Sequence, residues 1–343
     1  MQGKKPTLKS IAQHLGVSTA TVSNAFNRPS QLSASLREMI LSESRKLGYS
    51  GPSMAARSLR TGKTGVIGLL LSDELAYYFT DPVATLFLTG ISNTLDEQHV
   101  NMLLLPTNEA NYRNTQVHTI PDSFIIYGRP KDPVVLELIT RQQKPVITVD
   151  FTVPDYPSLH VDNENAAYEI AKHAIRSAED KVLIMGLRLE PSTALSLANL
   201  NNLYTGDESV SRLRFDGYKR ALDELNMPLS HQQVWQIHEL EEMSLKTMLR
   251  GALTDKKRAD VLLCMSDKIA LAALEVAREL NISMPEDIRI VGFDGIPSAE
   301  EAGLTTVQQP LLEKGQDAAK MALGLLAYES VVMETQLVVR SSS

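Results

Sequence analysis

The sequence predicts an all-helical N-terminal head followed by an α/β core built from two doubly wound parallel-sheet lobes. Residues 7–27 have the pattern of a helix, a glycine turn and a second helix. Residues 65–343 alternate short runs rich in Val, Ile and Leu with amphipathic segments. That alternation is typical of parallel strands covered by helices on both faces. At 279 residues the second part is too long for one ordinary core, so we expect two lobes.

The helical pair at residues 7–27 carries its own start and stop signals. Thr7 and Ser18 are placed to cap the two helices, because their hydroxyls can accept hydrogen bonds from free backbone N–H groups. Gly16 supplies the turn between the helices. An apolar stripe at i, i+3, i+4 and i+7 runs along the first helix and consists of Leu8, Ile11, Ala12 and Leu15.

The second helix has a polar outer face. Val22, Ala25 and Phe26 are expected to face inward. The residues left on the outside are Thr19, Ala20, Ser23 and Asn24. A helix-turn-helix places such an N-terminal face in the major groove of DNA. The alternative is a helical hairpin that only packs within an all-α domain.

Charge is distributed unevenly along the chain. Residues 1–64 carry ten basic and two acidic side chains, a net charge of +8. The whole chain is at −7, so residues 65–343 are at −15. A basic head favours a polyanion as its partner, because each phosphate that a protein neutralises releases a counterion. The alternative is a basic face that is only solvated, but the asymmetry within one chain favours DNA.

Two further segments complete the head. Ser33 is placed to cap a third helix that ends at Gly48. The face expected to close a three-helix core holds Leu36, Ile40, Glu43 and Leu47. Residues 54–59 suit one and a half turns of helix, which is too short to be stable alone in water. Such a helix needs a partner, and a second helix lying with it on DNA is one way to supply that partner; the alternative is an ordinary interdomain linker.

Together these segments resemble the lactose-repressor (LacI/GalR) family of bacterial transcription regulators. The resemblance is carried by TLKSIAQHLGVSTATVSNAFNRPSQLSASLREMILSESRKLGY, followed by AARSLRTGKTGVIGLLL, and it covers nearly the whole chain. It implies a helix-turn-helix DNA-binding domain at 1–50 and a hinge helix and linker at 51–64. Residues 65–343 are then an effector-binding and dimerisation domain with a periplasmic-binding-protein-like fold.

The resemblance also implies which residues contact DNA. Thr19, Ala20 and Asn24 match the positions that read base edges, and Asn24 can pair in bidentate fashion with adenine. The family often has Arg or His at this last position. Phosphate contacts, which set the register without reading sequence, are expected from Thr7, Ser18, Thr21, Ser23 and Asn27.

The hinge residues expected at the DNA are Ala56, Arg57 and Leu59. Leu59 matches the leucine that wedges into the central base step from the minor groove, which kinks the operator. Ala56 allows the hinge helices of two copies to approach closely.

The core is expected to form two series of strands. The first series lies at 66–71, 102–106, 123–128 and 145–150, and the second at 181–186, near 234, and at 260–265 and 287–294. In the fold that the resemblance implies, the chain crosses between lobes near 158–163, 294–297 and 308–312. The expected first lobe is then 65–159 with 297–309, and the second is 163–293 with 312–343.

Polar residues beyond the apolar strands mark a ligand site, since open α/β sheets bind ligands at the carboxyl ends of their strands. The residues in such positions are Ser72, Asp150, Ser266 and Asp294. Arg214 is on a helix expected to face the same cleft. By resemblance these residues match the family's effector contacts. Asp294 and Arg214 would accept from and donate to neighbouring hydroxyls of a sugar-like ligand.

Each of these residues also has a structural explanation. Asp294 can be a helix cap, and Arg214 can pair with a neighbouring acid. Tyr78 and Phe79 can stack on a sugar or base face, but aromatic residues after a first strand are as often part of the core. Many sugar-binding members have Asn at the position of Ser266, and this departure argues against a plain hexose.

Other classes of protein find little support. The sequence contains no GxGxxG, P-loop, GxSxG or HExxH motif, so we expect no enzyme and no cofactor or metal. The single Cys264 lies inside an apolar strand and suits a reducing cytosol. Residues 1–30 lack a secretory apolar region and no run spans a membrane, so a cytoplasmic location is expected.

The expected function is therefore a ligand-responsive repressor that binds a palindromic operator as a homodimer. The predicted effector is a sugar, a sugar derivative or a nucleoside. The chain has no leucine-heptad tail after its last predicted strand, which favours a dimer over a tetramer. The alternatives are an activator or a co-repressor-dependent regulator and, from another class, a sugar-binding module that does not contact DNA.

Overall fold

The computed structural model describes residues 6–51, 58, 62–72, 75–105, 116–190, 196–204, 209–237, 242–254 and 258–343. The chain divides into two units, Met1–Gly65 and Val66–Ser343. Each unit has a core of its own.

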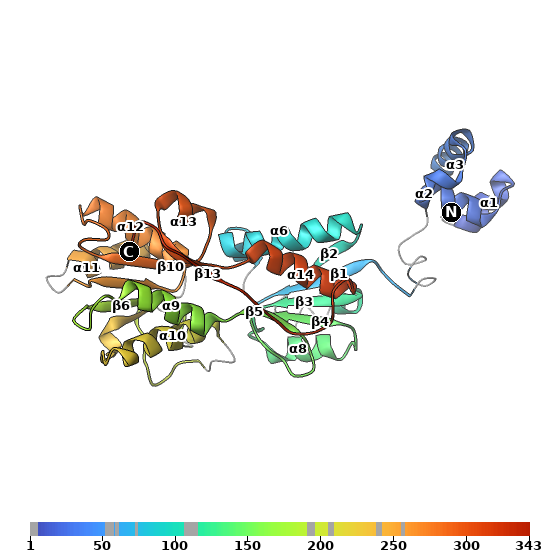
Figure 1. The fold of residues 1–343 in the computed structure, drawn as a ribbon. Coiled ribbons are helices and arrows are strands. Elements are labelled where there is room, and N and C mark those ends of the chain that lie inside the picture. The colour runs from blue at the N-terminus through green and yellow to red at the C-terminus, as the bar shows by residue number, and fades with distance from the viewer. Residues whose placement is uncertain are drawn as a thin grey trace. The chain divides into compact units, whose positions relative to one another are not determined.

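In residues 6–51 of the first unit, three helices pack together, α1 (Leu8–Leu15), α2 (Thr19–Asn27) and α3 (Ala34–Lys46), with a 3₁₀ turn η1 (Pro29–Gln31) before α3 (Figure 1). Thr7, Ser18 and Ser33 cap these helices through their side-chain oxygens, as predicted. Gly16 follows α1 with φ 66°, a left-handed conformation that glycine adopts without a Cβ clash.

The core of the head is small and consists of Ile11, Ala12, Val22, Ala25, Ile40 and Tyr49. The inner face predicted for α3 is wrong in its second half. Leu47 is 40% exposed, and Glu43 pairs with Lys46 at 2.7 Å. Ser44 lies inside instead, because it is four residues from Ile40 on the same face and the helix ends before Leu47.

The second unit contains two sheets. The first has the order β12-β5-β4-β3-β1-β2, formed by Val331–Met333, Ser158–Val161, Val146–Val149, Ser123–Tyr127, Val66–Leu71 and Asn101–Leu105. The second has the order β13-β11-β10-β9-β6-β8-β7, formed by Gln336–Val338, Thr305–Gln308, Arg289–Asp294, Val261–Cys264, Val182–Leu187, Val234–Ile237 and Ser196–Leu197. Among the described strands, only the edge strands β13 and β7 are antiparallel to their neighbours. The predicted fold class is confirmed.

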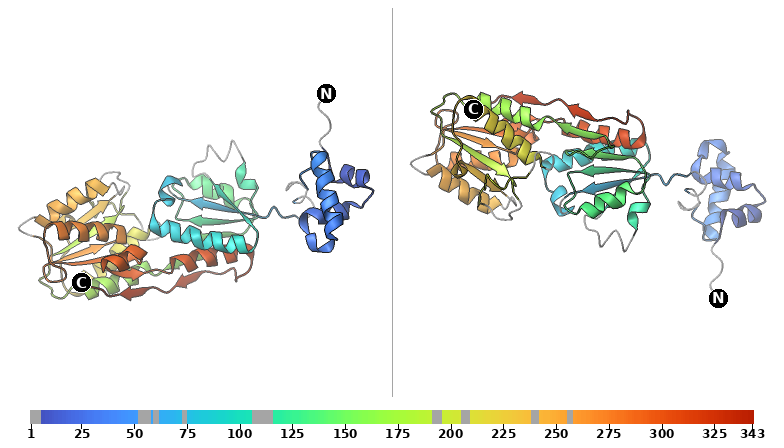
Figure 2. Two further views of the ribbon diagram at one scale, coloured as in Figure 1. Left: turned by 90° about the horizontal axis from the view of Figure 1, so that it is seen from above. Right: turned by 90° about the horizontal axis from the view of Figure 1, so that it is seen from below.

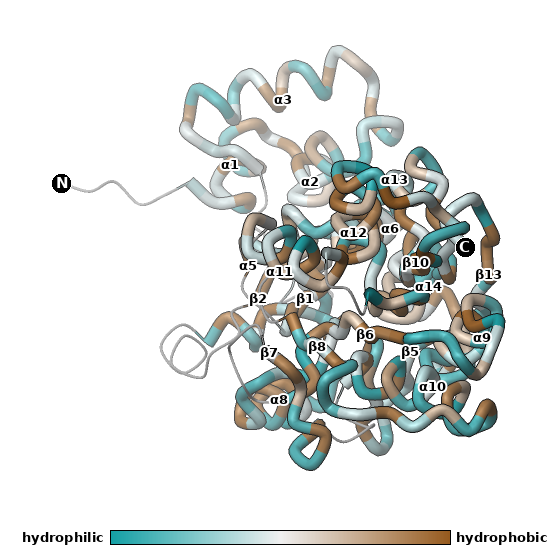
Figure 3. The backbone as a smooth tube through the Cα atoms, turned by 90° about the vertical axis from the view of Figure 1, so that its left-hand side faces the viewer, coloured by the Kyte–Doolittle hydropathy of each residue, from teal (hydrophilic) through white to brown (hydrophobic). Residues whose placement is uncertain are grey.

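Helices cover both faces of each sheet (Figure 2). In the first lobe α6 (Pro82–Glu97) and α14 (Leu311–Leu323) pack on one face, and α8 (Pro133–Thr140) packs on the other. In the second lobe α9 (Asn163–Ala174) and α10 (Val210–Glu224) lie opposite α11 (Glu242–Thr254) and α12 (Asp267–Glu279). Because strands such as β6 are buried between these layers, they are strongly hydrophobic (Figure 3).

Short elements fill the connections. A single helical turn, α5 (Leu75–Tyr78), follows β1, and α13 (Pro297–Ala302) follows β10. Two 3₁₀ turns, η2 (Val117–Thr119) and η4 (His231–Gln233), precede β3 and β8.

The chain crosses between the lobes at 161–163, 308–311 and 333–336. The predicted crossover near 294–297 is wrong, because β11 pairs in parallel with β10 and keeps residues 297–308 in the second lobe. The assignment of 312–343 to the second lobe is also wrong for most of that segment. α14 packs on α6, and β12 pairs with β5, so both belong to the first lobe.

Two glycines let α6 and α14 approach until their backbones touch. A Cβ atom at Gly90 would overlap the carbonyl oxygen of Leu312, and one at Gly315 would overlap that of Phe87. Neither position can hold a larger residue without separating the helices. This contact anchors α14 in the first lobe immediately after the chain leaves the second.

We expect Gly315→Ala to lower the free energy of unfolding by about 1–3 kcal/mol, the usual cost of overpacking. The new methyl group meets backbone atoms, which cannot turn aside as a flexible side chain can. Thermal and urea unfolding followed by circular dichroism measure the loss.

Gly251→Ala is the matched control. Gly251 lies in α11, and no atom is within 4 Å of its Cβ position. Alanine should therefore stabilise that helix by about 0.5–1 kcal/mol. Equal stability of the two variants would contradict the close helix contact.

Candidate functional sites

The outer face of α2 presents the residues predicted to read bases. Thr19 and Ala20 are exposed and Asn24 is half-buried, whereas Val22 and Ala25 are fully buried. The first turn of this helix therefore presents small side chains on its outer face. Their reach into a groove is short, so the backbone of α2 would have to come close to the bases.

Several residues predicted to contact phosphates already form hydrogen bonds within the head. Ser18 Oγ accepts from the backbone N–H of Thr21 at 3.0 Å, and the two hydroxyls are 2.8 Å apart. Asn27 Nδ2 donates to the backbone oxygen of Ser23 at 3.0 Å, and Thr7 caps α1. A capping hydroxyl still has a proton to donate. Phosphate contacts by these residues stay predictions.

The three hinge residues predicted to contact DNA are Ala56, Arg57 and Leu59, and they lie outside the described residues. Their roles rest on the sequence alone.

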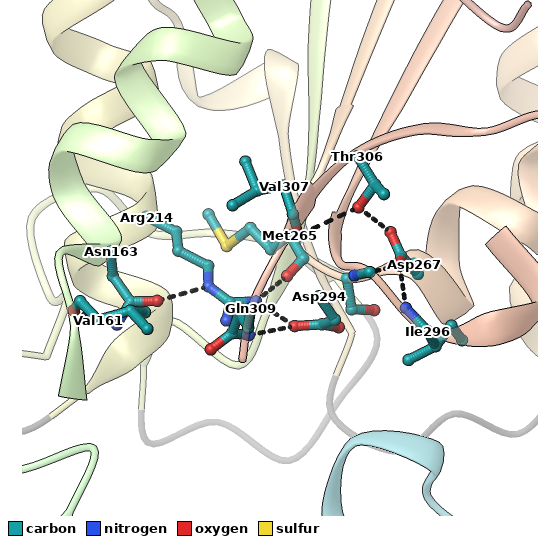
Figure 4. Close-up of polar contacts among 12 residues, drawn as sticks. Val161, Asn163, Arg214, Met265, Asp267, Asp294, Ile296, Thr306, Val307 and Gln309 are labelled. Atoms are coloured by element: carbon teal, nitrogen blue, oxygen red, sulfur yellow. Dashed lines mark hydrogen bonds and ion pairs between the residues drawn. The ribbon is translucent and has the colours of Figure 1, made fainter. Parts of the chain in front are cut away.

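Asp294 and Arg214 meet at the carboxyl end of the second-lobe sheet (Figure 4). Asp294 ends β10, and Arg214 comes from α10. Arg214 Nη1 lies 3.2 Å from Asp294 Oδ1, with the side chains 5% and 6% exposed. Arg214 Nε also donates to Asn163 Oδ1 at 3.0 Å, and Nη1 donates to the carbonyl of Met265. Three other elements therefore hold the guanidinium in one orientation.

Burial and charge act in opposite directions on Asp294. Desolvation raises the pKa of Asp294, and the neighbouring Arg214 opposes that rise. The guanidinium carbon of Arg214 lies 3.7 Å from the ring centroid of Phe293, a cation–π contact. Asp294 also has φ 131°, and strained backbone of this kind is frequent at binding sites.

Asp267 supports the turn that follows Asp294. Its Oδ2 accepts from the backbone N–H groups of Gly295 at 2.7 Å and Ile296 at 3.0 Å. Thr306 Oγ1 donates to its other carboxylate oxygen. Asp267 is fully buried and therefore acts on the site through the backbone that carries Asp294.

Ser266 is engaged as a helix cap. Its hydroxyl accepts from the backbone N–H of Ile269 at 3.3 Å, and the residue is buried. An effector contact by Ser266 stays a prediction. Cys264 is buried in β9 as predicted, and burial raises the pKa of its thiol.

The predicted site residue of the first lobe, Asp150, faces a buried lysine. Asp150 follows β4 with φ 61°, and its Oδ1 is 2.9 Å from the Nζ of Lys314. Lys314 also donates to Gln309 Oε1 at 3.2 Å, and Gln309 Nε2 donates to Asp294 Oδ1 at 2.9 Å. Polar side chains thus connect the predicted acids of the two lobes.

The remaining first-lobe candidates are placed differently from one another. The hydroxyls of Ser72 and Tyr78 are 3.0 Å apart. Tyr78 is 3% exposed and packs edge-on against Tyr127 in the core, which does not favour stacking on a ligand. Phe79 is 64% exposed and is therefore accessible for such a contact.

Four residues of this cluster were not among the predicted site residues: Asn163, Asp267, Gln309 and Lys314. Asn163 and Gln309 lie at the crossovers predicted near 158–163 and 308–312, so a search for polar side chains at these crossovers would have found them. Lys314 had no signal, because lysine in an amphipathic helix is almost always exposed.

Within the described ranges no three His, Cys, Asp or Glu residues are grouped so that they could hold a metal ion. None of the helices in these ranges is long and apolar enough to cross a membrane.

Comparisons with known proteins agree with this architecture. The family model of the periplasmic binding protein-like domain matches residues 200–343. An HTH-type transcriptional regulator of Mycobacterium tuberculosis is 32% identical, over 98% of this chain and 96% of the relative. A solved LacI-family regulator from Corynebacterium glutamicum has a TM-score of 0.70 at 26% identity and covers 99% of both chains. A LacI-family regulator from Enterococcus faecium, solved with bound ribose, has a TM-score of 0.64 at 21% identity, over 81% of this chain and 98% of that one.

The chain therefore belongs to the LacI family of helix-turn-helix transcriptional regulators. The predicted resemblance is confirmed over nearly the whole length. The Mycobacterium tuberculosis relative is a regulator of transcription.

We expect Arg214→Ala to destabilise the second unit more at pH 8 than at pH 5.5. Burial already raises the pKa of Asp294, so folding stability falls as pH rises from the unfolded pKa through the folded one. Without Arg214 the pKa of Asp294 rises further, and an unpaired buried carboxylate costs about 3–5 kcal/mol. Thermal unfolding of variant and parent at both pH values measures the difference.

Lys219→Ala is the matched control, because Lys219 lies on the same helix and pairs with Asp223 on the surface. Its loss should stay within about 0.5 kcal/mol at both pH values. An Arg214→Ala effect that does not change with pH would show that Asp294 has little charge to compensate.

Proposed function

We propose that this regulator is a repressor that binds a palindromic operator as a homodimer and responds to a small polyhydroxylated effector. One observation carries the proposal. The same chain joins a capped helix-turn-helix with an exposed reading face to a two-lobe unit whose strand ends hold the Arg214–Asp294 pair.

The shape and charge of the head support contact with DNA. The free N–H groups and the dipole at the start of α2 favour phosphate, and residues 1–64 carry a net charge of +8. Thr19, Ala20 and Asn24 are the proposed base contacts. Because these side chains are short, part of the specificity must come from operator deformation by the Leu59 wedge.

The Arg214–Asp294 pair supports a hydroxyl-rich effector. It offers a donor and an acceptor side by side, as adjacent hydroxyls of a sugar require. Both side chains are almost fully buried, so an effector reaches them only when the second unit opens. The ribose bound to the Enterococcus faecium relative agrees with a sugar-like ligand.

We propose further effector contacts from both lobes. They are Ser72, Phe79, Asp150 and Ser266, whereas the burial of Tyr78 argues against the stacking predicted for it. Ligand binding among them would change the angle between the lobes and reposition the hinges of the two copies, which Ala56 allows to approach. The effector can shift the DNA-bound population only by as much as it discriminates between the two lobe arrangements. We place this action in the cytoplasm, where the operator lies.

We expect operator binding to fall steeply with salt and to depend on Leu59. The probe is the duplex upstream of the chain's own gene, compared with a random-sequence duplex of equal length. The affinity should decrease along a log–log salt line with a slope of about −0.9 for each phosphate contacted. Leu59→Ala should lower affinity for the upstream duplex at least about tenfold, because the wedge that opens the base step is lost.

The matched control is Leu326→Ala, which shortens a leucine that is 43% exposed in the second unit and should leave affinity unchanged. A flat salt response with both duplexes would support the alternative of a ligand-binding module without DNA function. An unchanged affinity in Leu59→Ala would remove the hinge from the mechanism.

We expect a sugar, sugar derivative or nucleoside to raise the melting temperature through Asp294. A thermal-shift panel of such compounds identifies it, since a ligand at about 100 times its Kd adds about 2.7 kcal/mol of stability. Asp294→Asn should abolish the shift. Asp216→Asn, which changes a partly exposed acid paired with Arg212, should keep it.

Stabilisation that survives in Asp294→Asn would place the ligand elsewhere. The same compound added to the duplex assay gives the direction of control. Release of the duplex is the result expected for a repressor with an inducer, and tighter binding would identify a co-repressor.

A further inference from the structure

Lys314 occupies a position that elementary electrostatics disfavours. Its side chain is 1% exposed, and burying an ammonium group is costly unless it is paired. It is also the fourth residue of α14, where the positive end of the helix dipole opposes a cation. Neighbouring polar groups must therefore compensate the charge of the Lys314 ammonium group.

Two groups provide that compensation. Asp150 Oδ1 lies 2.9 Å from Lys314 Nζ, and Gln309 Oε1 accepts from the same Nζ at 3.2 Å. Asp150 and α14 both belong to the first lobe, whereas Gln309 lies in the crossover that leaves the second lobe. The bond between Lys314 and Gln309 therefore joins the two lobes.

Gln309 moves with the second lobe because it is bound twice to Asp294. Its backbone N–H donates to the backbone oxygen of Asp294 at 3.0 Å, and its Nε2 donates to Asp294 Oδ1 at 2.9 Å. The orientation of its amide is determined from both sides. The oxygen faces the ammonium group, and the nitrogen faces the carboxylate, so a turned amide would lose both bonds.

We propose that Gln309 and Lys314 form an interlobe relay that couples the state of Asp294 in the second lobe to Asp150 in the first. The relay is the run of side chains Asp150, Lys314, Gln309 and Asp294. The geometry makes Lys314 and Gln309 positioning residues that act on the two acids.

The shared oxygen of Asp294 makes the relay sensitive to occupancy. Its Oδ1 accepts from both Gln309 and Arg214. A hydroxyl that donates to this oxygen competes with the Gln309 amide. When that amide turns away, Lys314 loses the acceptor that Gln309 provides and keeps Asp150, so a change in the second lobe alters a contact in the first. This use of the relay rests on the proposed effector role of Asp294, but the coupling is a property of the chain without ligand.

A double-mutant cycle on the ligand-free chain tests the relay. The melting-temperature loss caused by Asp294→Asn is measured in the parent chain and in the pair variant Asp150→Asn/Lys314→Met. The pair variant removes both charges together, so no buried charge is left without a partner. Independent sites in different lobes should give additive losses, whereas we expect the loss in the pair variant to be less than about half as large. Without Lys314 the Gln309 amide is free to adapt to the carboxamide that replaces the Asp294 carboxylate.

Hydrogen exchange gives a second readout that a purely local role would not change. Asp294→Asn should increase amide exchange in the segment 146–161 of the first lobe, where the N–H of Asp150 donates to the oxygen of Leu159. The increase should disappear in Gln309→Leu, which breaks the relay and leaves every charge in place. This variant also replaces the pair variant in the cycle if the latter does not fold.

Lys320→Met in the parent background is the matched control, since Lys320 lies on the same helix and pairs with Asp317 near the surface. Its cycle with Asp294→Asn should be additive. Additive losses in the relay background, or exchange in 146–161 that is insensitive to Asp294→Asn, would overturn the relay. None of these measurements uses DNA or an effector, so failure of the proposed function would show separately in the duplex and thermal-shift assays.

Discussion

The buried ion pair between Arg214 and Asp294 constrains the whole second unit. Neither charged side chain can be buried without the other, because an isolated buried charge costs several kcal/mol. The guanidinium is therefore held by Asn163, Met265 and Phe293 as well as by the acid. These partners come from a crossover, a strand end and the neighbouring strand. The site thus links the second-lobe sheet to the chain that connects it with the first lobe.

The strand order explains why this pair lies at the carboxyl end of a parallel sheet, where ligands bind in open α/β folds. In both lobes the central strands are parallel, so their carboxyl ends lie at one edge of each sheet. Asp294 and Asp150 follow or end such strands, and both have a left-handed backbone. Residues held in such conformations need support from their surroundings. Asp267 gives that support to Asp294 through two backbone N–H groups, and Lys314 gives it to Asp150.

Local sequence patterns predicted the helices and long strands well. Assigning segments to a lobe depends on long-range strand pairing, which local patterns do not show. Caps such as Ser18 and long apolar strands such as Val66–Leu71 depend on neighbouring residues alone and were predicted at their observed places. The short strand β12 pairs with β5, which lies far away in the sequence, so its lobe was assigned wrongly. The predicted crossover near 294–297 placed β11 in the first lobe, although it pairs with the preceding strand β10. The sequence did not predict the buried position of Lys314 either, because its burial results from packing of α14 near the end of β4. The strand end predicted at Asp294 is observed, with Arg214 of α10 beside it, and effector binding by the two residues stays a proposal.

The small head favours the proposed control of DNA binding through the second unit. Its core cluster is small, and its reading helix begins with Thr19 and Ala20, which offer few hydrogen bonds to bases. We expect a single head with so few base contacts to bind weakly, so tight binding in the proposed dimer requires both heads to engage together. The second head then binds at an effective concentration set by the spacing of the hinges. A modest change in lobe angle can remove that advantage without altering any contact between α2 and DNA. Weak individual contacts are in this sense a condition for switching, because a head that bound tightly alone would remain on DNA whatever the effector did.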